Sequence, residues 1–472
     1  MIDKTAFIGF DTVYPLANGE SQARIHLDGA ASPLVMKTAM DAIEEILPHY
    51  SNSHSFSHAS ARVCAEAFKQ ASASILRITG ANEDYQCIFM GSGSTNCINN
   101  IARRLKSRKD KNGNLLNLAL VSAMEHHAND LPHRQYSTVE HFGLIDNGTT
   151  ADLGDIDLAG LESKLKQHEG EINYVTFSAV SNVTGIVNPI KEMTELAHQY
   201  GAYAVVDCAQ MAAHMPLNIA ELDADFVIFS GHKVYAGMAP GVMIAKQAIL
   251  AAHPSDEMGG GIVEQVSYLD ETFTSVYPNR EHPGTKNILG IHALSSVLSK
   301  MNDIGFRNIQ EHSETLWKYA FQALQQLRDS NGKPLISIYA KSKSPRLGAL
   351  SFNVINIDHG LVAAILSDYF GIAVRNECFC AHPYVSALLK QELWEIDLDN
   401  IPEEHQETVI NRKRGMIRVS FSLYNSESDI NKLCEALQRI ANNVEDYQQL
   451  YNALNNGDYI HKSFSIQTED YL

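Results

Sequence analysis

The chain has 472 residues, 45% of them hydrophobic and 19% charged, which is the composition of a globular protein rather than a disordered one. Its formal net charge of −18 argues against nucleic acid or anionic lipid as the main partner, because phosphate binding needs a net basic surface. Seven scattered cysteines, no basic-then-apolar leader and no apolar run of roughly 20 residues favour a cytoplasmic protein outside the membrane.

Short apolar runs alternate with amphipathic stretches over the first 290 residues. The runs that we expect to be buried strands are 86–90, 117–123, 173–179, 202–207, 225–229 and 241–245. Helices are expected at 94–106, 158–169 and 190–201. Strands that alternate with helices predict a mostly parallel sheet with helices on both faces. We therefore expect an N-terminal arm over residues 1–19 and a large α/β domain over residues 20–290.

The pattern changes after residue 290. Long helices are expected at 290–303 and 306–329, and they are followed by strands at 348–354, 371–375 and 415–422 and by a helix at 428–444. This order predicts a smaller α+β domain over residues 291–472. The stretch 391–407 has seven acidic residues and no basic ones, so an exposed insertion is expected over about 385–414.

Polar side chains stand where the predicted strands end. In an open parallel sheet ligands bind beyond the carboxyl ends of the strands, so these residues are candidates for a site. They are His126 after one strand, Asn182 after the next, Asp207 and Gln210 after a third, and Ser230, His232 and Lys233 after a fourth. A glycine-rich turn also places Ser94 and Thr95 in the first turn of a helix, where free N–H groups and the helix dipole attract an anion.

Each of these signals has an ordinary explanation on its own. Asp207 could cap a helix, Lys233 could pair with a buried acid, and the adjacent histidines have no carboxylate–histidine spacing that supports a metal site. Together they meet one requirement, that of pyridoxal 5′-phosphate. Its aldehyde needs a lysine, its ring nitrogen needs a carboxylate, and its phosphate needs hydroxyls and a helix N-terminus.

The ordered motifs resemble those of the class V aminotransferase family of fold type I pyridoxal-phosphate enzymes, and within it the cysteine desulfurase and selenocysteine lyase group. The motifs are "IHLDGAASP" (25–33), "GSGSTNCIN" (91–99), "MEHHAND" (124–130), "VDCAQ" (206–210), "FSGHK" (229–233), "REHPGTKN" (280–287), "GIAVRNECFCAHP" (371–383) and "IRVSFSLYN" (417–425). Two departures stand out: Gly29 replaces a usual asparagine, and "ECFCAHP" replaces a "GHHCAQP"-like loop.

The resemblance implies a role for each matched residue. Lys233 forms the Schiff base and moves the substrate Cα proton, His126 stacks on the cofactor ring, and Asp207 faces the ring nitrogen. Further cofactor ligands implied are Ser94, Thr95, Asn182, Gln210, Ser230 and His232, and Thr285 is implied to reach the phosphate of a neighbouring subunit in a homodimer with shared sites. The implied substrate-binding residues are Arg418, which grips the carboxylate, with Arg375 and His58.

The resemblance also implies an activity. Cys380 matches the cysteine that attacks the sulfur of L-cysteine or a related amino acid, so that alanine and an enzyme persulfide form and a sulfur-acceptor protein can follow. Cys378 is a rival nucleophile, and Cys380 could instead be inert packing. Two alternatives stay open: another class V enzyme (a C–S lyase, aminotransferase or epimerase) in which Cys380 is not the nucleophile, and a non-catalytic metal- or thiol-binding protein.

Overall fold

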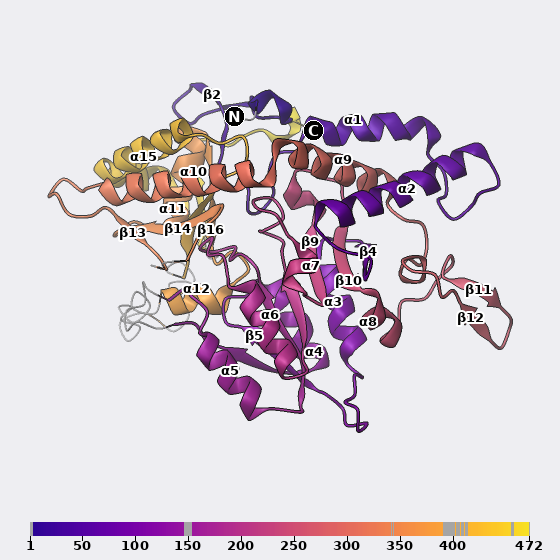
Figure 1. Ribbon diagram of the computed structural model, residues 1–472. Coiled ribbons are helices and arrows are strands. Elements are labelled where there is room, and N and C mark those ends of the chain that lie inside the picture. The colour runs from indigo at the N-terminus through magenta and orange to yellow at the C-terminus, as the bar shows by residue number, and fades with distance from the viewer. Residues whose placement is uncertain are drawn as a thin grey trace.

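A central sheet flanked by helices dominates the computed structural model, which describes residues 3–145, 153–340, 342, 344–389, 402, 406, 410, 414–454 and 457–471 (Figure 1). Among the described residues this sheet has seven strands, in the order β4 (Tyr85–Met90), β10 (Gly241–Lys246), β9 (Phe226–Ser230), β8 (Tyr203–Asp207), β7 (Ile172–Ser178), β5 (Leu118–Ser122) and β6 (Thr138–Phe142). All neighbours from β9 to β6 pair in parallel, and β10 runs antiparallel to both β9 and β4. The expected fold class, a mostly parallel sheet between helices, is confirmed.

Alternate residues of each central strand face opposite sides of the sheet, as the period of two requires. In β9, Val227 and Phe229 pack into one apolar cluster and Phe226 and Ile228 into the other. The first cluster is covered by α1 (Lys37–Ile46), α2 (Ala59–Ile78), α5 (Leu158–Gln167), α6 (Ile190–Gln199) and α9 (Ile288–Ile304), and the second by α3 (Ser94–Leu105) and α8 (Gln247–Ala252). Because both faces are covered, the strands read as continuous apolar runs.

A second, antiparallel sheet lies to one side of the central sheet (Figure 1). Its strands, in order, are β13 (Ile336–Ile338), β14 (Ala349–Val354), β17 (Met416–Ser420) and β16 (Arg375–Glu377), and α10 (Phe306–Gln326), α11 (His359–Phe370) and α15 (Glu427–Asn442) share its apolar cluster. Ile25 and Leu27 also belong to this cluster, although they precede the large sheet in the chain. The smaller α+β unit is thus present, while the domain boundaries at 19 and 290 stay predictions.

Several elements differ from the expectation. The run 371–375 was predicted to be one strand, which is wrong: β15 (Ile372–Ala373) pairs with β3 (Ile25–His26), and β16 begins at Arg375 and pairs with β17. Of the elements already named, β3, α1, α2, β6, α8, β13 and α11 had no prediction. The same holds for β1 (Val13–Pro15), β2 (Ser21–Ala23), α4 (Leu131–Tyr136), α7 (Ile219–Leu222), β11 (Val263–Val266), β12 (Glu271–Phe273), α12 (His382–Leu388), α16 (Val444–Leu450), β18 (Tyr451–Ala453) and β19 (Tyr459–His461). The acidic stretch 391–407 lies almost wholly outside the described residues. No described helix is long and apolar enough to cross a bilayer.

Candidate active site

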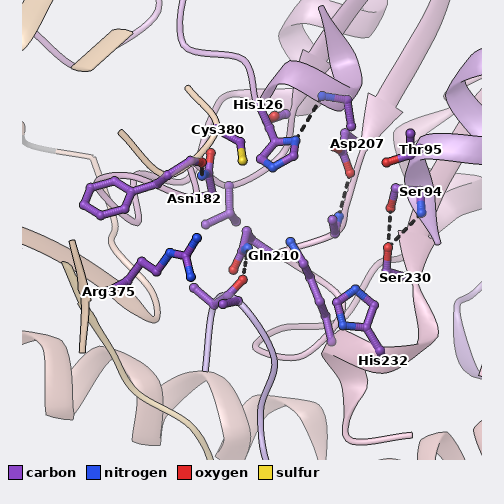
Figure 2. Close-up of a pocket in the computed structure, with 18 of the residues that line it drawn as sticks. Ser94, Thr95, His126, Asn182, Asp207, Gln210, Ser230, His232, Arg375 and Cys380 are labelled. Carbon is purple, nitrogen blue, oxygen red and sulfur yellow. Dashed lines mark hydrogen bonds between the residues drawn. The ribbon is translucent and has the colours of Figure 1, made fainter. Parts of the chain in front are cut away.

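A cavity of about 290 Å³ opens where the strands of the large sheet end, between that sheet and the second one. Side chains from both units line it. Of the residues singled out from the sequence, the structure brings together Ser94, Thr95, His126, Asn182, Asp207, Gln210, Ser230, His232, Lys233, Arg375, Cys380 and Arg418. Ser94, Thr95 and Ser230 lie at one end and Arg375 and Asn182 at the opposite end, with His126 and Gln210 between them (Figure 2).

Two of the cofactor- and substrate-binding residues that the resemblance implies do not line this cavity. Thr285 lines a separate pocket of about 270 Å³ together with His282 and Lys286. His58 is exposed and caps α2, where its Nδ1 accepts a hydrogen bond from the N–H of Ala61 at 3.4 Å. Their roles at a shared site and in substrate binding therefore stay predictions.

Lys233 and Asp207 come from the ends of adjacent strands. Asp207 is the last residue of β8, and Lys233 follows β9 in a short 3-10 helix (Gly231–Val234). Burial lowers the pKa of Lys233, and Arg418 lowers it further, against the opposing effect of Asp207. Burial raises the pKa of Asp207, opposed by the N–H of Ala209, which donates to Oδ1 at 2.9 Å. The site thus holds an amine that loses its proton more easily than an exposed lysine does, and a buried carboxylate that keeps its proton more readily than an exposed aspartate does.

His126 contributes a neutral, flat ring to the cavity. Its Nδ1 accepts a hydrogen bond from the N–H of Ala128 at 3.0 Å, which fixes the orientation of the imidazole (Figure 2). Burial, followed by the charges of Lys233, His127 and Arg418, lowers its pKa to about 3. The ring therefore carries no charge at neutral pH and presents a face to any planar group in the cavity.

The N-terminus of α3 forms a cradle for an anion. Gly93 has a φ of +68°, and a Cβ at this position would meet the Ser230 Oγ at 2.7 Å, so only glycine fits. The Ser230 Oγ accepts from the Ser94 N–H at 2.8 Å and lies 2.8 Å from the Ser94 hydroxyl. His232 stands beside them, oriented by a 2.9 Å contact between its Nδ1 and the hydroxyl of Ser32.

These residues fit pyridoxal 5′-phosphate. The cradle at α3 suits the phosphate, because helix N-termini and hydroxyls bind such anions. Asp207 offers a buried carboxylate for a protonated ring nitrogen, and His126 offers a neutral ring for stacking. The amine of Lys233 lines the same cavity. The donor set therefore matches each part of the cofactor with one residue type that can hold it.

Arg418 enters from β17 with a guanidinium that already has partners. Its Nη1 donates to the carbonyl of Asn182 at 3.0 Å, and its Nη2 to Oδ1 of Asp28 at 3.0 Å. Its Nε is buried and has no partner among the described residues. The ring of Phe379 lies 4.9 Å from the guanidinium carbon. Asp28 and Phe379 were not singled out from the sequence, although the motif "LDGAAS" contains Asp28.

A tight turn between β16 and α12 carries the two candidate thiols. Cys380 is exposed and lines the cavity. Cys378 is buried, and its thiol donates to the carbonyl of Arg414 at 3.3 Å. Burial raises the pKa of Cys378 to about 11, which disfavours its thiolate. Of the two thiols, only Cys380 is both accessible and inside the site.

The family model of class V aminotransferases matches residues 25–433 of this chain. A probable cysteine desulfurase of Vibrio cholerae is 29% identical over 431 residues, which cover 91% of this chain and 96% of that protein. The cysteine desulfurase of Escherichia coli K12 is 29% identical over 88% of this chain and 93% of its own length. The apo structure of a cysteine desulfurase from Thermococcus onnurineus NA1 superposes with a TM-score of 0.73 and 25% identity, covering 89% of this chain and 95% of that one. The chain therefore belongs to the class V aminotransferase family, whose enzymes depend on pyridoxal 5′-phosphate.

Proposed function

We propose that the chain is a cysteine desulfurase that converts L-cysteine to alanine and leaves the sulfur as a persulfide on Cys380. In this reaction the C–S bond of the substrate breaks and an S–S bond forms at the Cys380 Sγ. The β-carbon of the substrate takes a proton in place of sulfur. The proposal is supported by relatives that are cysteine desulfurases and by the presence of a lysine amine and an accessible thiol in one cavity.

Pyridoxal phosphate, when bound, acts as an electron sink that weakens the bonds to the substrate Cα. The residues that would hold it are Ser94, Thr95, Ser230 and His232 at the phosphate, Asp207 at the ring nitrogen, His126 at the ring face, and Asn182 and Gln210 near the ring hydroxyl. Gln210 is fixed for this task, because its Nε2 donates to the carbonyl of Ala30 at 2.9 Å.

Lys233 is the residue that moves the proton at the substrate Cα. A general base is most useful when its pKa lies near the working pH, and burial shifts Lys233 in that direction. Arg418 and Arg375 face each other across β16 and β17, and both line the cavity. Two guanidinium groups there favour the carboxylate of an amino acid at this end, away from the cradle at α3.

The single observation that carries the proposal is the position of Cys380. Its thiol is exposed, lines the cavity, and belongs to a turn that is tied to the site through the hydrogen bond from Asn182 Nδ2 to the carbonyl of Phe379 at 2.8 Å. A nucleophile held in a site by short contacts needs little further ordering to reach the substrate. We propose that Cys380 uses this position to take the sulfur.

Further parts of the proposal concern partners. We expect a homodimer in which Thr285 of each subunit reaches the site of the other, a sulfur-acceptor protein that takes the persulfide, and a cytoplasmic location. Thr285 is exposed and lines a pocket next to His282 and Lys286, as a residue that serves a neighbouring subunit would be. Gel filtration with multi-angle light scattering tests the dimer.

The experiment that tests the function is incubation of the purified, cofactor-loaded protein with L-cysteine. Alanine and protein-bound sulfur are expected in equal amounts in the first turnover, and pyruvate is expected only in traces. Cys380→Ser is expected to form no protein-bound sulfur, while the matched control Cys378→Ser forms it normally. Pyruvate as the main product, or protein-bound sulfur in Cys380→Ser, would favour another class V activity in which Cys380 is not the nucleophile.

A further inference from the structure

The turn that carries Cys380 adopts backbone angles that non-glycine residues avoid. Glu377, Phe379 and Cys380 have φ values of +82°, +51° and +54°. A Cβ is crowded in this left-handed region, so the conformation is unfavourable for all three residues. The N–H of Ala381 donates to the carbonyl of Cys378 at 2.8 Å and closes the turn. Contacts outside the turn are needed to hold residues in such a conformation.

His127 supplies much of that outside contact. Its backbone N–H donates to the carbonyl of Cys380 at 2.6 Å. Its ring Nε2 lies 3.3 Å from the backbone nitrogen of His382 and 3.0 Å from the Nδ1 of His382. The two imidazole rings stack with centroids 4.8 Å apart and an angle of 8° between their planes. His127, the residue next to His126, is thus tied to Cys380 itself and to His382, two residues further along the chain.

The hydrogen-bond pattern fixes the protonation state of His127. A backbone N–H is always a donor, so the Nε2 of His127 must accept from His382 and cannot carry a proton. The neutral tautomer of His127 therefore has its proton on Nδ1. For the 3.0 Å contact between the rings to be a hydrogen bond, Nδ1 of His382 must donate to the same acceptor. A proton placed on Nε2 of His127 would remove both contacts between this ring and His382.

We propose that His127 and His382 are positioning residues: as a neutral pair they hold the Cys380 turn over the cavity, and protonation of His127 at Nε2 releases it. This inference rests on the proposed function, since it gives the pair a role in presenting the Cys380 nucleophile. Release in acid would let the strained turn relax and would carry the thiol away from the substrate. The pair thereby links the reactivity of the site to pH.

Burial, with help from two neighbouring basic groups, keeps His127 neutral at physiological pH. The pKa of His127 lies below the ordinary histidine value, because of burial first and then of His382 and Arg134. Asp130 acts in the opposite direction, but its carboxylate is engaged by Arg134 and by His141, which lies 3.0 Å away. His126, whose ring centroid is 6.4 Å away, stays uncharged. The contact is therefore intact at pH 7.5 and is lost as the pH falls through the lowered pKa of His127.

The test is hydrogen–deuterium exchange of the cofactor-loaded protein, without substrate, between pH 5.0 and 7.5. The amides of Ala381 and His382 report directly, because one closes the turn and the other donates to His127. After correction for the intrinsic pH dependence of exchange, we expect both amides to exchange at least tenfold faster at pH 5.0 than at pH 7.5. Equal corrected rates would overturn the proposal.

Three variants sharpen the test. His127→Gln places a side chain that does not titrate at this position, so it is expected to abolish the acid-induced increase in exchange. An increase that persists in this variant would overturn the proposal. His141→Gln is the matched control, because His141 contacts the same Asp130 but not the turn. This variant is expected to show the same acid-induced increase in exchange as the wild type. His382→Gln changes an exposed side chain and is expected to raise exchange at pH 7.5 at least threefold; unchanged exchange would count against the pair.

The exchange measurement does not depend on turnover. If exchange is faster in acid in the wild type but not in His127→Gln, while no protein-bound sulfur forms from L-cysteine, the role of the histidine pair is supported and the proposed function is contradicted. If the persulfide forms but exchange does not depend on pH in this way, the proposed function is supported and the role of the histidine pair is contradicted.

Discussion

Asp28 and Arg418 form an ion pair at the end of the cavity that is proposed to bind the substrate, with 3.0 Å between Oδ1 and Nη2 and only 18% and 4% of the two side chains exposed. Two hydrogen bonds and one close approach of the backbone at Gly29 place Asp28 beside Arg418. The Ser420 N–H donates to the carbonyl of Leu27, the Ala30 N–H donates to the Ser420 hydroxyl, and a Cβ on Gly29 would meet the Ser422 Oγ at 2.1 Å. Gly29, which departs from the family pattern, therefore leaves the space that the Ser422 hydroxyl occupies in this packing.

The pair predicts that Asp28 weakens the binding of a substrate carboxylate. Asp28→Asn keeps the shape but removes a negative charge beside the guanidinium, so an incoming carboxylate no longer meets a like charge. We expect the KM for L-cysteine to fall about fivefold, which corresponds to about 1 kcal/mol. Steady-state kinetics checks this, with Asp256→Asn, which removes an exposed pair with Arg103, as the control. A raised KM would instead show that Asp28 orients Arg418.

The close packing at the N-terminus of α3 predicts that one added methyl group at Gly93 lowers the affinity for the cofactor. Gly93→Ala would place its Cβ against the Ser230 hydroxyl at 2.7 Å and at a φ of +68°. We expect cofactor affinity to fall at least tenfold, measured by fluorescence titration of the cofactor-free protein. Gly113→Ala is a matched control, because Gly113 has a φ of +86° but nothing within 4 Å of its Cβ. If both variants bind the cofactor equally well, the cradle does not hold the phosphate.

The buried carboxyl group of Glu125 is expected to make the free energy of unfolding depend on pH. It is buried, and its carboxylate accepts from the Ser178 N–H at 2.8 Å, the Ser178 hydroxyl at 2.6 Å and the Asn129 amide at 2.7 Å. Burial raises its pKa to about 7, against those donors. The folded protein therefore binds an extra proton between about pH 4.5 and 7, so this contribution to stability is present in acid and is lost as the pH rises through 7.

Glu125→Gln removes that titration and separates it from other groups. The free energy of unfolding of the wild type should exceed that of the variant by more at pH 5 than at pH 8, with a change on the order of 2 kcal/mol. Urea denaturation at the two pH values measures the difference. A difference that grows toward pH 8 would contradict a raised pKa for Glu125.

Much of the site could be predicted from the sequence because of one geometric rule. His126, Asp207 and Lys233 lie at or just beyond the ends of three separate strands, β5, β8 and β9, which run parallel in one sheet. The carboxyl ends of parallel strands meet at one edge, so residues far apart in the chain converge there. Apolar runs with turn signals located these strands well, and that was sufficient to assemble the cofactor end of the cavity.

The end of the cavity around Arg418 depends on tertiary packing, which local sequence patterns do not predict. Asp28 and Arg418 are 390 positions apart and meet only because the segment around Gly29 lies against β17. The turn angles at Glu377, Phe379 and Cys380 contradict the preference of each residue, so no turn rule predicts them. The break between β15 and β16 likewise follows from a change of pairing partner, from β3 to β17, within a single apolar run.

The two cysteines of the turn predict a clear difference in thiol reactivity. Cys380 is exposed in the cavity, whereas Cys378 is 3% exposed, donates to the carbonyl of Arg414 and has a pKa raised to about 11. At pH 8 only about one in a thousand Cys378 thiols would be ionised, and the thiolate is the reactive form. Iodoacetamide should therefore modify Cys380 first. Mass spectrometry of the labelled peptide checks this: Cys380→Ser should remove the fast phase, and Cys378→Ser should leave its rate within about twofold. A fast phase that disappears in Cys378→Ser instead would mean that the turn presents the other thiol, and the assignment of the nucleophile would have to be reversed.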